Sequence, residues 1–521
     1  MTQPFVGVVI PAHNARPLLS DPLESVRAQT RRRHPSMRSI RSVLTLVVAV
    51  PGATSCHEAP GKPLAPVRTA VAGVLRPAPP GGGGRFFSPD GKRVVLLCGS
   101  HTWNTLQDIG FTSPPGAFDY TGFLDSLVAW NHNFLRLYSW EQASFSAGTP
   151  RRLWFSPVAY RRTGPGLALD SLPKFDLTKL DDAYFTRMRE RVVAAGRRGI
   201  YVSVMLFNGW SLEGKGFHIG NPWTGHPFNR ANNINGIDGD RDHDGEGTEL
   251  HTLGDSATLA LQERYVRRVI ATLRDLDNVL YEISNESAPG STEWQYHMIR
   301  LIHHAEGTLP HRHPVGMTVE YPNGDNASLT DSPADWFSPK GHLEEPVPFP
   351  GRQIVIWDTD HLCGMCASIG WVWKALLTGY NPILMDGWDG RATVVGWAPY
   401  ARSDPKWELA RRNLGYAVTL TNRIGLGRLS PQGGLASSGY CLADTSAATP
   451  AFLVYVPRRG WPWRAGVDVD LRRLPASDTL DAAWLNLRDG TEHAGGKVTG
   501  GQRAHLSSPV RAETVLILER R

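Results

Sequence analysis

Eight short apolar runs, separated by longer stretches with helical periodicity, are the feature that most limits how this chain can fold. The runs lie at residues 94–98, 134–138, 201–207, 279–283, 315–319, 335–337, 354–357 and 382–385. Apolar residues recur at helical spacing in stretches that begin at Asp181, Asp255 and Thr292, and again over residues 407–418. Strands that alternate with helices form parallel sheets, and eight of them close a (β/α)8 TIM barrel. The sequence therefore predicts an α/β fold in which residues 85–428 form a TIM barrel.

Residues 429–521 change to short alternating runs bounded by turn residues, which is the pattern of antiparallel strands. We expect strands at residues 452–456, 467–471, 483–487 and 514–518, with a hairpin turn at residues 488–490. These strands predict a small C-terminal β-sandwich appended to the barrel. The sequence is compatible with a module that binds carbohydrate and with one that only braces the barrel.

Residues 37–56 have the layout of a secretion signal. Arg38 and Arg41 precede an apolar stretch at residues 43–50, and small residues then lead to Cys56. The final Ala-Thr-Ser-Cys resembles a bacterial lipobox, in which the cysteine is lipidated, and an ordinary cleaved signal is the alternative. Residues 57–84 are rich in Pro and Gly and predict a linker. We therefore expect export, either as a cell-envelope lipoprotein or as a periplasmic or secreted protein, with membrane contact only through a lipid anchor at Cys56.

Residues 1–36 precede this signal and form a separate segment. Residues 6–30 resemble the opening strand and helix of family-two glycosyltransferases, whose Val-Val-Ile-Pro-Ala-x-Asn segment begins a nucleotide-sugar-binding fold. The remainder of such a domain and its acidic metal ligands do not follow, so we reject that function. We predict that residues 1–36 are an over-extended gene start, with translation from Met37, or a fusion remnant.

The net charge of +6 is concentrated near the N-terminus. Residues 1–55 hold seven arginines against Asp21 and Glu24, so the rest of the chain carries a charge of about +1. We expect no nucleic-acid partner, because no basic surplus is left to neutralise phosphates. The chain has 41% hydrophobic and 20% charged residues, which predicts a globular protein. It lacks the run of about 20 apolar residues that a membrane-spanning helix needs. We also expect a monomer.

The five cysteines are too few for a disulfide scaffold. Cys363 and Cys366 form a Cys-x-x-Cys motif, but no second pair exists to complete a four-ligand zinc site. A redox motif would have to open a helix in a thioredoxin-like unit, and the surrounding sequence does not fit one. We expect a local disulfide or two free thiols at this motif.

An acidic loop at residues 238–246 resembles the beginning of a calcium-binding loop. Asp240, Asp242 and Asp244 are followed by Gly245, as such loops require, but the twelfth position is His251 in place of a glutamate. The loop could hold calcium or could be a solvated acidic surface. We expect no other metal and no organic cofactor.

Polar and aromatic residues gather after the predicted strands, where TIM barrels carry their chemistry. Those expected to contact substrate are His101, Trp103, Arg136, Trp140, Asn285, Glu320, Asp360, His361, Asp386 and Trp388. Acids and indoles at one barrel mouth suit glycoside hydrolysis, in which one carboxyl protonates the leaving oxygen and a second stabilises or attacks the anomeric carbon. Indoles also cover sugar faces, although each tryptophan could equally be core packing. We therefore expect a carbohydrate substrate.

The fourth predicted strand ends in a motif that points to a known clan. Its sequence, VLYEISNES at residues 279–287, resembles the strand-four motif of the TIM-barrel clan of retaining glycosidases. The resemblance implies that Glu286 is the general acid/base and that Asn285 orients the sugar. The clan's nucleophile is a Glu at the end of strand seven, and Asp358 occupies that place here, with Asp360 as the alternative two residues on. The clan also keeps an arginine near the nucleophile, which would be Arg136, although a core salt bridge explains that residue equally well.

Residues 75–521 as a whole resemble bacterial apiosidase-like glycoside hydrolases. The resemblance rests on GSHTWNTLQD at residues 99–108, FLRLYSWEQ at residues 134–142, and the Asp-Thr-Asp-His segment of strand seven. Proteins of this set often carry a C-terminal sandwich labelled as collagen-binding, a label that we do not take literally. The resemblance implies an exported glycosidase that acts on a plant or microbial polysaccharide or glycoside with retention of configuration. The alternative is a non-catalytic carbohydrate-binding or adhesion protein on a degenerate barrel, since the Glu of strand seven is missing.

Overall fold

The computed structural model describes residues 61–79, 85–146, 152–214, 220–310, 312–347, 349, 353–388, 405–446, 448–458 and 466–520. The predicted extra segment at residues 1–36, the signal that ends at Cys56 and parts of the predicted linker lie outside these residues. Among the described helices, none is both long and apolar enough to cross a membrane.

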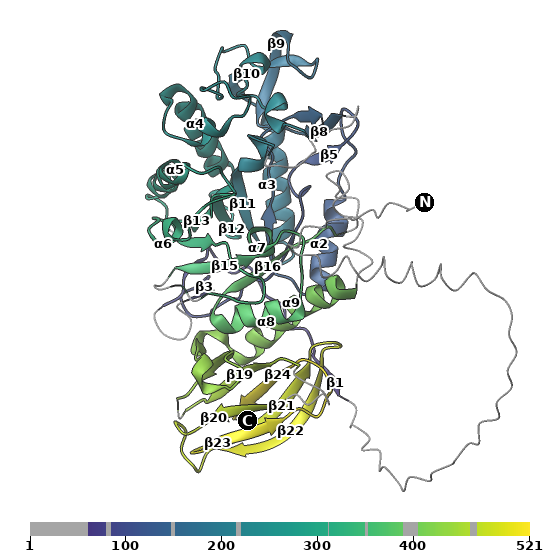
Figure 1. The fold of residues 1–521 in the computed structure, drawn as a ribbon, viewed down its shortest axis with the longest axis vertical. Coiled ribbons are helices and arrows are strands. Elements are labelled where there is room, and N and C mark those ends of the chain that lie inside the picture. Colours follow the sequence, from purple (N-terminus) through teal and green to yellow (C-terminus); the bar gives the residue numbers. More distant parts are fainter. Residues whose placement is uncertain are drawn as a thin grey trace, which may run out of the picture. The chain divides into compact units, whose positions relative to one another are not determined.

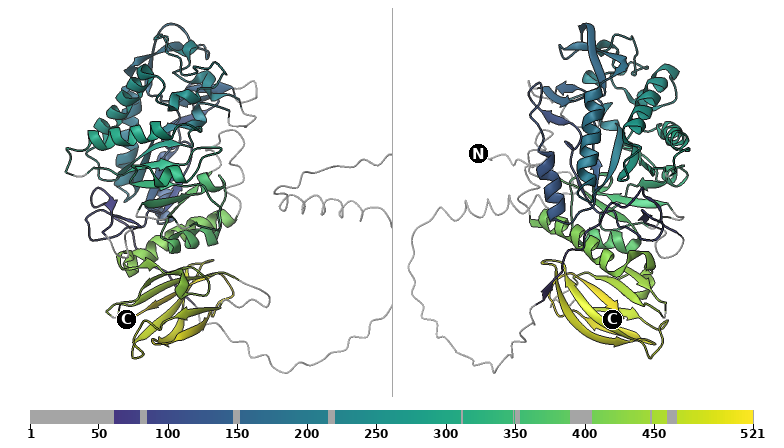
Figure 2. Two further views of the ribbon diagram at one scale, coloured as in Figure 1. Left: turned by 60° about the vertical axis from the view of Figure 1, so that its left-hand side comes forward. Right: turned by 180° about the vertical axis from the view of Figure 1, so that it is seen from behind.

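Eight parallel strands form a closed barrel with helices on its outside (Figures 1 and 2). In chain order they are β4 (Gly99–His101), β6 (Phe134–Leu137), β11 (Tyr201–Asn208), β12 (Val279–Asn285), β13 (Val315–Thr318), β14 (Trp336–Ser338), β15 (Ile354–Asp358) and β16 (Asn381–Met385). Each strand pairs with the next along the chain, and β16 pairs with β4 to close the ring. The predicted TIM barrel is confirmed.

The first barrel strand does not lie where the apolar run predicted it. The ladder begins at Gly99, which pairs with Phe134 on one side and Ile383 on the other. A Cβ atom on Gly99 would lie 2.0 Å from the carbonyl oxygen of Phe134, so this approach requires glycine. Val95 and Leu97 of the predicted strand instead pack in the barrel floor. The prediction of residues 94–98 was wrong because burial there comes from the floor and not from the strand ladder.

The barrel interior changes from apolar to polar along its strands. Residues two apart on a strand point to the same side. Phe134, Tyr201 and Leu280 pack together at the floor, and the residues two positions further on are Arg136, Ser203 and Glu282. A polar layer therefore lies directly above the apolar floor, towards the carboxyl ends of the strands.

The predicted helices are present, and two of them begin at the predicted capping aspartates. The helices of the described residues are α2 (Tyr120–Ala129), α3 (Asp182–Gly196), α4 (Ser256–Leu273), α5 (Thr292–Ala305), α6 (Ala327–Thr330), α7 (Thr359–Leu362), α8 (Ile369–Thr378) and α9 (Pro405–Ile424). The Asp181 carboxylate caps α3 by accepting from the Ala183 N–H, and Asp255 caps α4 by accepting from Thr258 at 2.9 Å. Phe185, Met188 and Val192 of α3 are buried, as the helical spacing predicts.

Several elements that follow the barrel strands were not predicted. β5 (Asp108–Gly110), β7 (Ser144–Ser146) and β8 (Arg152–Ser156) form a three-stranded sheet, and β9 (Tyr160–Leu167) pairs with β10 (Pro173–Leu180). The short 3-10 helices η1 (Gly209–Ser211), η2 (Pro222–Gly225), η3 (Arg230–Asn232) and η4 (Thr248–His251) lie between β11 and α4. These segments lack the length or the periodicity that sequence patterns can detect.

The C-terminal strands form two packed antiparallel sheets, so the predicted β-sandwich is confirmed. The larger sheet runs in the order β1-β22-β21-β24-β19-β18-β17, and β20 pairs with β23. Their bounds are β1 (Lys62–Pro63), β17 (Ser430–Pro431), β18 (Cys441–Asp444), β19 (Ala451–Val456), β20 (Gly466–Asp470), β21 (Thr479–Asn486), β22 (Thr491–Thr499), β23 (Arg503–Ser507) and β24 (Thr514–Glu519). Phe452, Trp484 and Leu516 of one sheet pack with Val467 and Val469 of the other.

Part of the segment predicted as a linker is built into the fold. β1 pairs with β22, and β2 (Arg76–Pro77) pairs with β3 (Phe87–Ser88). Leu75 is buried in the barrel floor. Composition alone suggested a tether, but these backbone groups find partners in neighbouring strands.

Candidate active site

A cavity of about 500 Å³ lies at the carboxyl ends of the barrel strands. Its wall combines two acids, a histidine and several aromatic and sulfur-containing side chains. The lining residues are Trp103, Tyr138, Trp140, Trp210, Glu286, Tyr321, Asp360, His361, Leu362, Cys363, Gly364, Met365 and Met385. Of the predicted site residues, the structure brings Trp103, Trp140, Glu286, Asp360 and His361 into this cavity.

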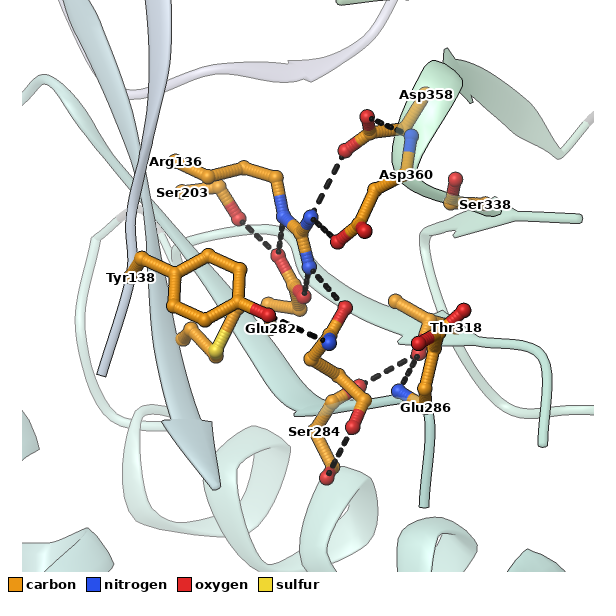
Figure 3. A network of polar contacts seen from close by, with 12 residues as sticks. Arg136, Tyr138, Ser203, Glu282, Ser284, Glu286, Thr318, Ser338, Asp358 and Asp360 are labelled. Atoms are coloured by element: carbon orange, nitrogen blue, oxygen red, sulfur yellow. Dashed lines mark hydrogen bonds and ion pairs between the residues drawn. The ribbon is translucent and has the colours of Figure 1, made fainter. Parts of the chain in front are cut away.

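Arg136 on β6 is the centre of a polar network beneath the cavity (Figure 3). Its guanidinium, 2% exposed, pairs with Glu282 through Nε, at 3.0 Å, and Nη2. Nη1 donates to Asp358 at 2.9 Å and to Asp360 at 3.0 Å. Nη2 also donates to the side-chain oxygen of Asn285 at 2.8 Å. One cation thus compensates three carboxylates, which is how a protein can bury this much negative charge.

The two strand-seven aspartates differ in what surrounds them. Asp358 is fully buried and accepts from Arg136, from His101 Nε2 at 3.1 Å and from the backbone N–H of Asp360 at 2.9 Å. Burial alone would raise the pKa of Asp358, but His101 and Arg136 outweigh it and hold that pKa well below its usual range. Asp358 is therefore an ionised structural anion with both oxygens engaged.

Asp360 reaches the cavity because a helix begins between the two aspartates. α7 starts at Thr359, with Asp358 as its N-cap, so Asp360 lies in the first helical turn. Burial raises the pKa of Asp360, and the neighbouring Asp358 raises it further, while Arg136 opposes both. Asp360 is consequently the acid of this pair that lines the cavity and shares the arginine.

Asn285 and His361 are locked by one another. The Asn285 oxygen accepts from Arg136 and from His361 Nε2 at 3.0 Å, and its Nδ2 donates to the Tyr138 hydroxyl at 2.9 Å. His361 Nδ1 lies 2.7 Å from the Ser338 hydroxyl. Burial, aided by Arg136, lowers the pKa of His361 to about 3. The imidazole is therefore neutral near pH 7, with its proton on Nε2, because the Asn285 oxygen can only accept.

Glu286 follows β12 in an unusual backbone conformation. Its φ of +44° lies in the left-handed region, which residues other than glycine rarely adopt. The backbone N–H donates to Thr318 Oγ1 at 3.2 Å, and the indole N–H of Trp210 donates to the carboxylate. The residue is 5% exposed, so its carboxylate is held against the cavity wall instead of in bulk water.

Aromatic side chains form much of the remaining wall. Trp210 stacks on Tyr321 with ring centroids 5.9 Å apart, and Trp140 lies 5.4 Å from Tyr138. The Trp140 indole N–H donates to the carbonyl of Trp103 at 3.1 Å. Flat, partly polar rings of this kind suit the apolar faces of sugar rings.

Six predicted site residues lie outside the lining of this cavity, in addition to Asp358. Asn285, Arg136 and His101 lie in the network beneath it. The Glu320 carboxylate accepts from Ser291 and Thr292 at the start of α5. Asp386 pairs with Arg411 of α9 through both oxygens. Trp388 packs on Phe118 and Phe123 of the α2 region and donates its indole N–H to Ser126.

Other site residues were not proposed from the sequence. Glu282 sits inside the apolar run of strand four, and a charged residue within such a run was the signal that could have marked it. Tyr138 and Met385 line the cavity from positions at or just after strand ends. Cys363 and Cys366 form a disulfide, one of the two states expected, and Cys363 contributes to the cavity wall.

The acidic loop places three possible metal ligands together. Single ligand atoms of Asp240, Asp242 and Glu249 all lie within 4.8 Å of one another. Asp244 instead accepts from the backbone N–H of Glu246 at 2.8 Å. The acid that completes the group is Glu249, two residues before the twelfth loop position. Calcium binding at this loop stays a prediction, and the group does not border the cavity.

Comparison with known proteins gives few matches in sequence. Residues 153–322 match the model of a domain of unknown function, DUF6298. A search of curated proteins finds no match.

Comparison with solved structures supports the architecture. A glycoside hydrolase family 5 protein from Bacteroides vulgatus aligns with a TM-score of 0.55 at 11% identity, covering 87% of this chain and 95% of that one. A candidate glycoside hydrolase from the same bacterium also aligns at 0.55, with 12% identity over 86% of this chain and 82% of that one. At such low identity the likeness establishes the TIM-barrel fold, and function has to be argued from the site.

Proposed function

We propose that this protein is a glycoside hydrolase in which Glu286 and Asp360 are the two catalytic carboxyls. The observation that carries the proposal is that both acids line one aromatic-walled cavity at the carboxyl ends of the barrel strands. Two carboxyls flanking the scissile bond are what glycoside hydrolysis requires. The fold shared with glycoside hydrolases of known structure agrees with this function.

Glu286 is proposed as the general acid/base. Its position directly after Asn285 at the end of the fourth barrel strand matches the clan motif. The Trp210 indole N–H donates to the Glu286 carboxylate and orients it, as a group that exchanges a proton with the glycosidic oxygen requires.

Asp360 is proposed as the second carboxyl, in preference to Asp358. The sequence favoured Asp358 because the apolar strand ends there, but three donors occupy its oxygens and it does not line the cavity. Asp360 keeps one oxygen on Arg136, and this bond stabilises the ionised form that a nucleophile needs. Asp360 lies in the first turn of α7 and lines the cavity although its side chain is shorter than that of the usual Glu.

We propose a retaining mechanism on an exported protein that acts on a plant or microbial polysaccharide or glycoside. Retention follows if Asp360 attacks the anomeric carbon directly, which needs the two carboxyls about 5–5.5 Å apart in the complex. Proton NMR of the first-formed product anomer distinguishes retention from inversion. Export rests on the signal-like segment of the sequence.

The experiment is sugar release by the full chain from a panel of polysaccharides and aryl glycosides, compared among variants. Glu286→Gln and Asp360→Asn should each lose about 10²-fold or more in kcat/KM. Glu263→Gln is a matched control, because Glu263 pairs with His297 on the outer surface and does not border the cavity. Full activity of Asp360→Asn with loss in Asp358→Asn would return the second role to Asp358.

A non-catalytic carbohydrate-binding protein is the second candidate. It is favoured by the absence of a Glu at the end of β15, where Asp358 is instead neutralised below the cavity. Binding of one glycan without sugar release from any of them would establish this alternative.

A further inference from the structure

We propose that Glu141, which does not border the cavity, is a positioning residue that holds Glu286 in place through two separate chains of contacts. Glu141 follows β6, and neither the clan motif nor the cavity lining includes it. The inference rests on the proposed function, because it concerns the acid/base of that reaction. One chain of contacts runs through η1 to Glu286 itself. The other runs through His251 to Ser287, the residue after Glu286.

The first chain begins with two bonds between Glu141 and the ends of η1. The Glu141 carboxylate accepts from the backbone N–H of Asn208 at 2.8 Å, just before the turn. The Glu141 backbone N–H donates to Ser211 Oγ at 3.0 Å, at the end of the turn. One residue therefore fixes η1 at both ends.

η1 in turn contacts Glu286 through its backbone and its side chain. A Cβ atom on Gly209 would lie 2.1 Å from the Glu286 carbonyl oxygen and 2.7 Å from Ser287 Cα, so the turn packs directly against this backbone. Trp210, the next residue, donates its indole N–H to the Glu286 carboxylate. A displacement of η1 would therefore move the donor that orients the acid/base.

The second chain runs through a buried histidine. His251 Nε2 lies 3.3 Å from Glu141 Oε1, and its Nδ1 lies 2.9 Å from Ser287 Oγ. The ring is fully buried and stacks on Trp294 with centroids 4.2 Å apart, which leaves it little freedom to turn. His251 thus links Glu141 to the residue that follows Glu286.

The charge of Glu141 supports both chains. Burial would raise the pKa of Glu141, but His251 and His226 outweigh it and lower that pKa to about 2. His226 Nδ1 accepts from the Phe228 N–H at 3.1 Å, so the proton of this ring lies on Nε2, 3.5 Å from Glu141. An ionised Glu141 carboxylate accepts from the Asn208 N–H and lies within ion-pair distance of both histidine rings.

Glu286 needs such support because its backbone is strained. A left-handed φ on a glutamate persists only when the surroundings determine it. The experiment therefore measures proton donation by Glu286 and not activity alone. Protonation matters in proportion to the basicity of the leaving oxygen, so a dinitrophenyl glycoside hardly needs it and a phenyl glycoside depends on it.

The test compares kcat/KM of the full chain on phenyl and dinitrophenyl glycosides of the sugar that the parent cleaves. Glu141→Gln should lose about 10- to 100-fold on the phenyl glycoside and stay within about 3-fold on the dinitrophenyl glycoside. Ser211→Ala removes only the acceptor of the Glu141 N–H and should show the same selectivity with a smaller loss of about 3- to 10-fold. Ser211→Ala provides the test of the proposal if the Glu141→Gln variant does not fold.

Glu306→Gln is the matched structural control. Glu306 forms a fully buried pair with His313 at 2.9 Å, next to the start of β13 and away from the cavity. Any loss in this variant should be equal on the two substrates, because the Glu306 carboxylate contacts His313 and Tyr281, which lies near the start of β12 and away from Glu286.

The outcomes separate the two proposals. Equal losses on both substrates in Glu141→Gln, or no loss on either, would overturn the positioning role while leaving the glycosidase intact. A parent without activity on any glycoside would overturn the proposed function, and the role of Glu141 would fall with it.

Discussion

Replacement of Arg136 by methionine should destabilise the barrel strongly, because it removes the cation that compensates buried carboxylates. The variant loses both of its bonds to Glu282. Among the residues that the structure describes, the Ser203 hydroxyl at 3.1 Å is then the hydrogen-bond donor left to Glu282. Asp358 keeps its hydrogen bonds to His101 and to the Asp360 N–H, so the loss of Arg136 affects it less. Glu282 is therefore the group that sets the cost.

The expected loss in free energy of unfolding is about 3–5 kcal/mol, the usual cost of removing one partner from a buried ion pair. Urea denaturation followed by far-UV circular dichroism measures it as a lower midpoint at unchanged slope. The second substitution Glu282→Gln, added to Arg136→Met, should recover about 2 kcal/mol or more, since no unpaired charge then remains at that position.

The loss should also depend on pH in a defined direction. Uncompensated buried negative charge is relieved by proton uptake, so the deficit of Arg136→Met relative to the parent should be larger near pH 8 than near pH 5. A deficit below about 1 kcal/mol, or one that does not change with pH, would refute the reasoning that Arg136 acts by neutralising these acids.

Three further predictions concern the disulfide, a buried histidine and a buried ion pair. The Cys363–Cys366 disulfide closes a loop of four residues, so its reduction should lower the free energy of unfolding by about 2 kcal/mol. Urea denaturation with and without a thiol-free reductant measures this loss. A loss twice as large would contradict an origin in loop entropy. Burial lowers the pKa of His132 to about 4, below that of the unfolded chain, so this residue stabilises the fold above about pH 6.5 and loses about 3 kcal/mol of that contribution by about pH 4. His132→Gln should flatten the acid side of the stability profile, and an unchanged profile would assign acid sensitivity elsewhere. Asp386→Asn breaks a buried bidentate pair with Arg411 and should cost about 3–5 kcal/mol in the same assay, whereas a loss under about 1 kcal/mol would show that Arg411 finds other partners.

Most of the fold follows from local sequence patterns. Seven of the eight barrel strands begin within one residue of the predicted position, because each is an apolar run bounded by turn or capping residues. The displaced strand, at Gly99, shows the limit of this signal. An apolar run reports burial, but it does not report which neighbour provides the burial.

The strand-end position of Glu286 was also accessible from the sequence. Asn285 and Glu286 stand at the end of a strand that the sequence pattern alone predicts, which places them at the barrel mouth. The structure puts Glu286 in the cavity wall. Glu141 shares this accessible position, yet its contacts with Asn208 and His251 join residues 67 and 110 positions further along the chain. No local pattern encodes pairings of that separation.

The sequence by itself determined which residue types stand at the end of each strand, since strand periodicity and the chain order fix this. Only the tertiary structure decided which of them face the cavity. Asp358 and Asp360 differ by two positions in sequence, but the start of α7 between them and the reach of Arg136 from β6 leave one beneath the cavity and one in its wall. The physical reason is that a side chain's depth depends on the register of neighbouring strands and on where buried charges find partners, and both are set by residues distant in the chain.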